Sequence, residues 1–268
     1  MDKQQGALEE RDTVFCDALA EFAAGAGHEI NNPLAIISGH AQLLLAKCED
    51  AETRRHLAII VAQVKRAYEM IADVRLYSRP PEPVFTSFDP SELLASTAER
   101  FRRAYADWPG SLRCDSFEDS APGPCEPNDF PPKPVSDPAM LASILDALLK
   151  NAVEANPSDA HGTIRLVCRI WESSDGARRL EWIVEDNGPG VSDAVRPHLF
   201  SPYYSGRSSG RGLGFGLPRS AAFAVRLGGT LKIEKPVDFE TGARFLLTIP
   251  YSAEGTTSSA QSASLTPP

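Results

Sequence analysis

The feature that most constrains the fold is a narrow apolar stripe in the stretch from about Glu52 to Tyr77. Its members follow one another at alternating steps of three and four residues: Leu57, Ile60, Val64, Ala67, Ile71 and Val74. This spacing is the a/d pattern of a helix that packs along one side in a bundle or coiled coil. The sequence therefore predicts a long helix whose apolar side is covered by other helices.

A similar stripe precedes it, from about Asp12 to Lys47, and predicts another long helix. Its apolar members are Phe15, Leu19, Phe22, Ala26, Ile30, Leu34, Ile37, Ala41 and Leu44. A short polar break around Glu49–Asp50 joins the two, which predicts an antiparallel hairpin. One hairpin cannot bury both sides of its stripe, so we predict a homodimer whose two hairpins form a four-helix bundle. The alternative is a monomer whose hairpin packs on the downstream part of the chain.

The chain changes character after the hairpin. The proline-rich residues 80–88 predict a linker, and residues 89–251 predict an α/β two-layer sandwich with helices on one face of a sheet. Tails are expected at residues 1–11 and 252–268, and a Pro-rich insertion at 109–134. The expected helices run from Asp89 to Ala106 and from Asp137 to Asn156, each opened by a capping Asp followed by Pro, and the expected strands are Thr163–Trp171, Leu180–Glu185, Thr230–Ile233 and Ala243–Ile249.

Composition excludes several functions. A net charge of -9 over 268 residues argues against a nucleic-acid-binding surface, because phosphate contacts need clustered Lys and Arg. The five cysteines are odd in number and lack CxxC spacing, which favours free thiols in a reducing compartment over disulfides or a zinc site. No apolar run approaches the roughly 20 residues that span a bilayer. We therefore expect no membrane insertion by this chain and a cytoplasmic location.

His28 is the first candidate for chemistry. It lies two residues after Ala26 and two before Ile30, so at about 100° per residue it points away from the apolar stripe and into solvent. Glu29 is adjacent and Asn32 is one helical turn on. An imidazole beside a carboxylate that can take its proton can act as a nucleophile. The alternative is an ordinary surface histidine next to an acid.

Two glycine clusters are candidates for ligand binding. The first, EDNGPG at Glu185–Gly190, follows a predicted strand and places Asp186 where a carboxylate could accept a hydrogen bond from an exocyclic amine such as that of adenine. The second, GRGLGFGL at Gly210–Leu217, leads into a helical stretch whose first backbone N–H groups suit phosphate. Neither fits the GxGxxG or GxxxxGK[ST] motif. Each cluster alone could be an ordinary turn.

Taken in order, these segments resemble a known family. The string FAAGAGHEINNPLAIISGHAQLLL around His28 resembles the phospho-acceptor box of sensor histidine kinases. The two glycine clusters, together with LDALLKNAVEAN and LFSPYYSGR, resemble the Bergerat-type ATP-binding domain shared by histidine kinases, certain topoisomerases and Hsp90-type chaperones. The resemblance covers about residues 12–250. It implies a dimerisation and histidine phosphotransfer hairpin at 12–79 and an ATP-binding catalytic domain at 89–251.

The resemblance also implies individual roles. His28 would accept the phosphoryl group, Glu29 would be the general base, and Asn32 would orient water for dephosphorylating a partner. Asn151 would bind Mg²⁺, whose preference for hard oxygen ligands an amide oxygen satisfies. The other implied ATP-binding residues are Asp186, Gly188, Gly190, Phe200, Arg207, Gly212, Gly214 and Gly216. One departure is Ala147, where the family often has a second asparagine.

The implied function is ATP-dependent autophosphorylation on His28 followed by phosphotransfer to an aspartate of a response regulator receiver domain, with regulator phosphatase activity as an additional possibility. A first alternative is another Bergerat-type ATPase, which would need a catalytic glutamate where this chain has Ala147. A second is a degenerate kinase that serves as a dimeric scaffold. Only about a dozen residues precede the first helix, so the input signal is expected to come through a partner protein unless the chain is a fragment of a larger sensor.

Overall fold

The computed structural model describes residues 25, 27, 29–116, 133–156, 161–172, 178–202, 204 and 214–252. The chain divides into two units. The first consists of Met1–Pro81 and His198–Arg219, and the second consists of Glu82–Pro197 and Ser220–Pro268. Within the described residues, none of the helices combines the length and the apolar character that crossing a membrane requires.

The first unit contains the predicted hairpin. Residues 29–47 are helical, and α2 spans Ala51–Ser78. The Asp50 side chain caps α2 by accepting a hydrogen bond from the Thr53 amide at 2.8 Å. Hydrogen bonds from the side chain and the amide of Thr53 lower the pKa of Asp50. The Arg54 guanidinium closes the turn by donating to the carbonyls of Leu45 and Cys48. Further along, the Tyr68 hydroxyl donates to the Asn31 carbonyl at 3.1 Å and so joins the two arms of the hairpin.

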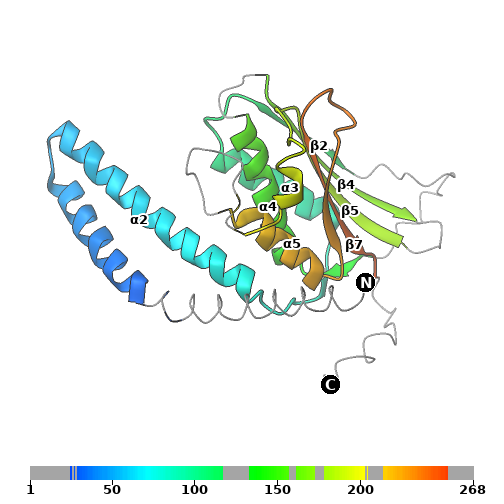
Figure 1. The fold of residues 1–268 in the computed structure, drawn as a ribbon, viewed down its shortest axis with the longest axis horizontal. Coiled ribbons are helices and arrows are strands. Elements are labelled where there is room, and N and C mark those ends of the chain that lie inside the picture. Colours follow the sequence, from blue (N-terminus) through cyan, green and yellow to red (C-terminus); the bar gives the residue numbers. More distant parts are fainter. Residues whose placement is uncertain are drawn as a thin grey trace. The chain divides into compact units, whose positions relative to one another are not determined.

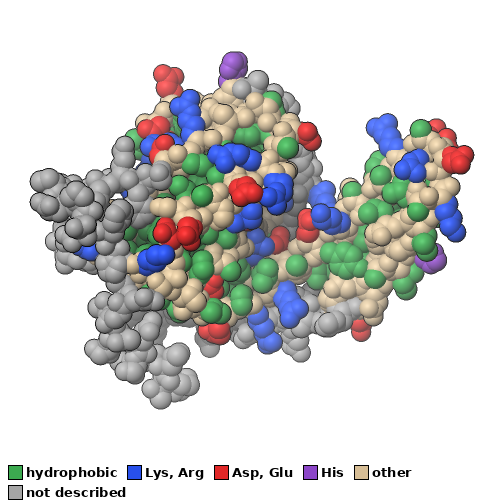
Figure 2. Space-filling view, turned by 180° about the vertical axis from the view of Figure 1, so that it is seen from behind, with side chains coloured by type: hydrophobic (Ala, Val, Ile, Leu, Met, Phe, Trp, Pro, Cys, Tyr) green, Lys and Arg blue, Asp and Glu red, His purple; other side chains and the backbone are tan. Residues whose placement is uncertain are grey.

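The apolar stripe is only partly covered by the hairpin itself. Leu57, Val64 and Val74 are buried, whereas Ile60 of the same stripe is 41% exposed. Hydrophobic side chains are visible along the arms of the hairpin (Figure 2). The large apolar residues exposed on the two arms are Ile30, Ile36, Ile37, Leu43, Leu44, Ile59 and Ile60. This much exposed apolar surface is expected of a helix pair that associates with further helices.

The second unit is built on a five-stranded sheet in the order β2-β4-β5-β7-β6 (Figure 1). Strand β2 runs parallel to β4, and the other neighbours are antiparallel. Helices α3 and α4 cover one face of the sheet, as predicted. The bounds are α3 Pro90–Ala104, α4 Pro138–Ala155, α5 Gly216–Arg226, β1 Thr86–Ser87, β2 Ser111–Ser116, β3 Val135–Ser136, β4 Thr163–Glu172, β5 Arg178–Asp186, β6 Thr230–Glu234 and β7 Ala243–Pro250.

The core lies between the sheet and its helices. Helix α4 contributes four completely buried side chains, Leu141, Ile144, Leu145 and Leu148. The facing strands contribute alternate residues, as expected of a sheet with one covered face: Ile164, Leu166, Leu180, Trp182, Leu247 and Ile249. The largest of them, Trp182, is at the centre of β5.

Both predicted caps are present. Asp89 precedes α3 and accepts a hydrogen bond from the Ser91 amide at 2.9 Å. Asp137 precedes α4 and accepts from the Met140 amide at 2.9 Å, while its other carboxylate oxygen accepts from the Val84 amide at 2.8 Å. Asp137 thus both starts a helix and anchors the segment that enters the second unit.

Two short strands correct the sequence analysis. Ser111–Ser116, which were assigned to the Pro-rich insertion at 109–134, form edge strand β2 and pair with β4. Thr86–Ser87, assigned to the linker, pair with Val135–Ser136. Both strands are short and derive their stability from partners far along the chain, so their local composition resembles that of a loop. Residues 117–132 and both predicted tails, apart from Ser252, lie outside the described residues.

Candidate functional site

The surroundings of the phospho-acceptor candidate are helical. His28 itself lies outside the described residues, but Glu29 and Asn32 lie on the helical residues 29–47 and are both exposed. The helix continues through Pro33, although a proline cannot donate the backbone hydrogen bond that this position normally supplies. Glu29 and Asn32 are therefore accessible to a protein or a nucleotide that approaches this arm.

Asp186 occupies the end of β5, where the strand gives way to the first glycine cluster. Asp186 is only 3% exposed, and one of its carboxylate oxygens accepts a hydrogen bond from the Gly188 amide at 2.9 Å. This bond orients the carboxylate and closes a tight turn. A buried, oriented acceptor of this kind can recognise an amine donor of a ligand with high selectivity.

Asn187 ties the same turn to the start of β4. Its side-chain oxygen accepts from the Thr163 amide at 2.7 Å, and its side-chain nitrogen donates to the His161 carbonyl at 2.9 Å. Its backbone amide donates to the Thr163 carbonyl at 3.2 Å. Sequence reasoning missed this residue, and the Asp-Asn-Gly tripeptide was the signal, since Asn favours turns in which its side chain replaces a backbone partner.

The glycines of the turn allow close backbone approach. A Cβ atom on Gly188 would lie 2.8 Å from the Asp186 carboxylate and 2.9 Å from the Asn156 side-chain nitrogen. Gly190 has a φ of 75°, and a Cβ there would lie 2.7 Å from the carbonyl oxygen of Gly242. Gly242 has a φ of 131°, and a Cβ atom there would overlap the carbonyl oxygen of Asp186. The turn therefore packs directly against the loop between β6 and β7.

Helix α4 supplies the candidate metal ligand. Asn151 is half-buried near the end of α4, and Asn156, the C-cap of the same helix, is the buried residue beside Gly188. Ala147, one turn before Asn151, is buried in the core. The described residues contain no group of three or more His, Cys, Asp or Glu side chains arranged to hold a metal ion. A single amide oxygen fits Mg²⁺, which takes most of its ligands from water and phosphate.

The second glycine cluster lies within the first unit. Phe200 is half-buried after the short helix η1, Arg196–His198, whereas Arg207 and Gly212 lie outside the described residues. Gly214 has a φ of 72°, and its Cβ position is occupied by the Tyr204 carbonyl. Gly216 begins α5, and a Cβ there would meet open space. The backbone N–H groups at the N-terminus of a helix such as α5 favour an anion.

A contact that sequence reasoning missed joins this segment to α2. Phe215 is 2% exposed and packs on Val74, with its ring edge-on to Tyr77 at a centroid distance of 5.5 Å. Arg219 forms an ion pair with Asp73 on the same stretch of α2. Val74 was predicted as the last member of the apolar stripe, but its partner is more than a hundred residues away and no local pattern identifies it.

Two family models match the chain. Residues 18–83 match the His Kinase A (phospho-acceptor) domain, and residues 136–253 match the histidine kinase-, DNA gyrase B-, and HSP90-like ATPase. The first match includes His28, Glu29 and Asn32. The second includes Asn151, Asp186 and both glycine clusters.

Curated relatives span both matched segments. The chain is 26% identical over 238 residues to the signal transduction histidine-protein kinase AtoS of Escherichia coli, covering 88% of this chain and 36% of that protein. It is 32% identical to the sensor protein kinase PilS of Pseudomonas aeruginosa, covering 75% and 36% respectively. It is also 32% identical to the sensory histidine kinase/phosphatase NtrB of Rhodobacter capsulatus, covering 74% and 53%. The chain therefore spans between about a third and a half of the length of these relatives.

Solved structures share the fold. The crystal structure of full-length ShkA in complex with AMPPNP has a TM-score of 0.68 at 24% identity, covering 87% of this chain and 46% of that one. The histidine kinase ThkA in complex with response regulator protein TrrA has a TM-score of 0.60 at 20% identity, covering 92% and 66%. A hairpin followed by a two-layer α/β domain is thus an established arrangement.

Proposed function

The chain belongs to the family of sensor histidine kinases of two-component systems, and we propose that it uses ATP to phosphorylate its own His28 and then passes the phosphoryl group to an aspartate of a response regulator. The observation that carries this proposal is the combination of a phospho-acceptor domain match around His28 with a buried, oriented carboxylate at Asp186 in the ATPase match. Either feature alone would fit a different class of protein.

Residues of the match to the ATPase model support the nucleotide half of the proposal. Asp186 would accept a hydrogen bond from the exocyclic amine of adenine, because its carboxylate is buried and held by the Gly188 amide. The Asn151 amide oxygen would hold Mg²⁺, which when bound offsets negative charge on the phosphates. We assign the phosphate contacts to the second glycine cluster, Gly212, Gly214 and Gly216, with Arg207. Phe200 and Gly190 complete the proposed ATP-binding set.

The first unit supports the transfer step. A ring nitrogen of His28 attacks the γ-phosphorus in line, a new P–N bond forms, and the bond to the bridging oxygen of ADP breaks. Glu29, exposed on the adjacent position of the helix, takes the imidazole proton. The resulting phosphoramidate is reactive enough to donate its phosphoryl group to a carboxylate on a partner.

The hairpin is proposed to act as a homodimer. The exposed apolar residues of both arms, among them Ile36 and Leu43 at 63% and 61% exposure, would be covered in a four-helix bundle. Such a bundle would also leave the exposed Glu29 and Asn32 available to a docked partner.

The partner is proposed to be a receiver domain. The solved ThkA complex contains the response regulator TrrA, a partner of this class. NtrB is named a kinase/phosphatase, so we also propose that Asn32 orients water for dephosphorylation of the regulator. We place these reactions in the cytoplasm, where ATP is available and cysteines remain reduced.

Incubation with γ-³²P-labelled ATP tests the proposal. The wild-type chain should acquire acid-labile label, and His28→Gln should not, while Asp186→Asn should lose both nucleotide binding and label. His40→Gln, on the same arm, is the matched control and should label normally. Label that persists in His28→Gln would refute the assignment of His28. Steady ATP hydrolysis without label would favour a different ATPase, and absence of nucleotide binding would favour a scaffold.

A further inference from the structure

Glu185 and Asp186 are neighbours on β5 and therefore point to opposite faces of the sheet. Asp186 lies at the candidate nucleotide site on the helix-covered face. Glu185 lies on the other face, yet it is 0% exposed. A carboxylate buried this completely is unfavourable unless it is paired and hydrogen-bonded, so its position requires a physical reason.

The partners of Glu185 come from two different segments. One carboxylate oxygen accepts from the Arg244 guanidinium on β7 at 3.0 Å. The other accepts from the backbone amides of Val237 and Asp238 at 2.7 and 2.8 Å. Glu185 thus joins its neighbouring strand to residues 235–242, the loop between β6 and β7. We call this segment the β6–β7 loop.

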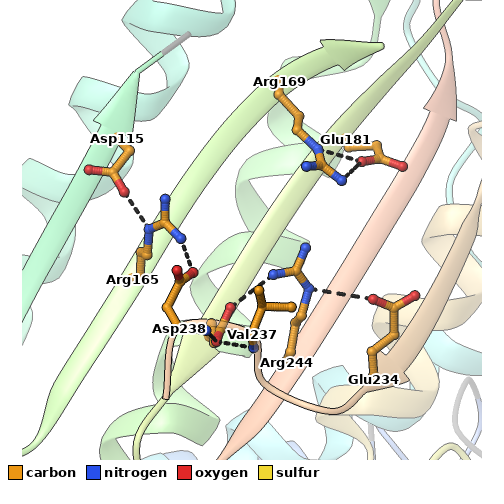
Figure 3. Close-up of polar contacts among 9 residues, drawn as sticks. Asp115, Arg165, Arg169, Glu181, Glu234, Val237, Asp238 and Arg244 are labelled. Atoms are coloured by element: carbon orange, nitrogen blue, oxygen red, sulfur yellow. Dashed lines mark hydrogen bonds and ion pairs between the residues drawn. The ribbon is translucent and has the colours of Figure 1, made fainter. Parts of the chain in front are cut away.

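A second arginine holds the same loop. Arg165 on β4 forms ion pairs with Asp238 of the β6–β7 loop and with Asp115 on β2 (Figure 3). Arg244 extends the network in the other direction to Glu234 on β6, with a nitrogen to oxygen distance of 3.4 Å. The β6–β7 loop is therefore fixed at two points, by Glu185 and by Arg165, to the face of the sheet opposite α3 and α4. We call this the uncovered face, because no helix of the described residues packs on it.

The fixed loop ends at the nucleotide turn. Gly242 is the last residue of the loop, and a Cβ atom on it would overlap the carbonyl oxygen of Asp186. A Cβ atom on Gly190 would lie only 2.7 Å from the carbonyl oxygen of Gly242. A displacement of the loop would remove the backbone surface against which the turn from Asp186 to Gly190 packs. Contacts on the uncovered face are thus transmitted to the covered face through the backbone.

We propose that Glu185 is a positioning residue for nucleotide binding, which holds the β6–β7 loop so that Gly242 supports the Asp186–Gly190 turn. This inference rests on the proposed function of that turn in binding ATP. Glu185 does not touch the nucleotide, since it acts from the opposite face of the sheet. Only a carboxylate can accept from a guanidinium with one oxygen and from two amides with the other.

Glu181 provides a matched control on the same strand and face. It is 4% exposed and pairs with Arg169 at 2.7 Å, so it is also a buried carboxylate in an ion pair (Figure 3). Its ion-pair partner is on β4 and not in the β6–β7 loop. Glu181→Gln therefore removes a comparable buried charge without releasing the loop.

The experiment measures the dissociation constant of Mg·AMPPNP for the full chain by calorimetry. Glu185→Gln places an amide nitrogen against the Arg244 guanidinium or the loop amides, so we expect nucleotide affinity to fall about tenfold, the scale of one charged hydrogen bond. Glu181→Gln should change it less than about twofold. Asp238→Asn, on an exposed side chain that does not threaten folding, should weaken binding about two- to threefold by loosening the Arg165 contact.

Amide hydrogen exchange gives a readout that does not depend on ATP. Glu185→Gln and Asp238→Asn should accelerate exchange at Gly188 and Gly190, whereas Glu181→Gln should not. Equal effects of Glu181→Gln and Glu185→Gln, or unchanged exchange and affinity in the folded Glu185 and Asp238 variants, would overturn the inference. If the wild type binds AMPPNP but does not label His28, the proposed function fails and the inference stands. If the wild type does not bind AMPPNP, the assignment of the turn to nucleotide fails and the inference fails with it.

Discussion

The two Asp-Pro helix caps, identical in sequence, should differ in their contribution to stability. Asp89 and Asp137 each accept a hydrogen bond from an amide in the first turn of their helix. Asp137 also accepts from the Val84 amide at 2.8 Å and is buried, whereas Asp89 is only half-buried. Substitution of each by alanine separates the contribution of the cap to the unfolding free energy from the contribution of the second hydrogen bond.

The expected magnitudes follow from these contacts. Loss of a capping side chain costs about 1 kcal/mol of unfolding free energy, which is our expectation for Asp89→Ala. Asp137→Ala also removes the acceptor of the Val84 amide, and loss of this part-buried hydrogen bond to a charged group costs about 1–2 kcal/mol more. We therefore expect about 2–3 kcal/mol for Asp137→Ala. Asp137→Asn retains the cap but not the second acceptor, so its cost should fall between the two.

Tryptophan fluorescence during urea unfolding measures these differences, because it reports on the second unit of the chain. All three tryptophans, Trp108, Trp171 and Trp182, lie in the second unit, which contains both caps. The free energies follow from the midpoints at constant slope. Equal destabilisation by Asp89→Ala and Asp137→Ala would show that the bond to Val84 adds nothing, and would refute the reasoning.

Three further predictions concern other parts of the chain. Burial raises the pKa of the Cys168 thiol, so iodoacetamide at pH 8.5 should not modify Cys168 in the folded chain, which peptide mass mapping checks. The free energy of unfolding should also fall as pH rises above about 9, because only the unfolded state then loses this proton, and urea titrations measure that fall. Gly242→Ala, at a φ of 131°, should destabilise by about 2–4 kcal/mol in the same unfolding assay. Gly39→Ala, on a helix of the first unit with open space around it, should stabilise by about 0.5–1 kcal/mol when urea unfolding is followed by circular dichroism, which reports helix loss in that unit. Phe215→Ala should accelerate amide exchange over the last turns of α2, where Val74 and Tyr77 lose their ring contact; unchanged exchange there would contradict the packing argument.

The parts of the fold that could be predicted are those with a local cause. An aspartate followed by proline starts both α3 and α4, because capping involves only the next three residues. The steps of three and four predicted α2 to within one residue at each end, Ala51–Ser78 against Glu52–Tyr77. The four core strands were predicted because alternate residues face the covered side of the sheet. In contrast, β2 was missed, because its six residues pair with β4 across some fifty intervening positions.

The same division applies to the candidate site. The requirement for glycine at Gly188 arises in part from Asp186, two residues earlier, so the sequence displays it directly. Gly190 also leaves room for the Gly242 carbonyl, a contact with no local signature. Their roles toward ATP, like those of His28, Glu29 and Asn32, stay predictions until the labelling and binding experiments are made. Asn187 was overlooked although it lies in the motif, since its value depends on reaching Thr163 on the neighbouring strand.

The uncovered face of the sheet shows why a site motif alone is an incomplete description of a nucleotide turn. Glu185 contacts Val237, Asp238 and Arg244, more than fifty positions away, and none of these contacts has a local signature. A chain could therefore keep every residue from Asp186 to Gly190 and still bind ATP poorly if the β6–β7 loop were released. Conversely, an apolar residue at 185 would remove the acceptor that the buried Arg244 guanidinium and the two loop amides share, and so release the β6–β7 loop from β5. The register of β5 with β7 pairs Glu185 with Arg244 and Asp186 with Ala243. The ion pair of Glu185 and the position of the Asp186–Gly190 turn therefore both depend on this one register.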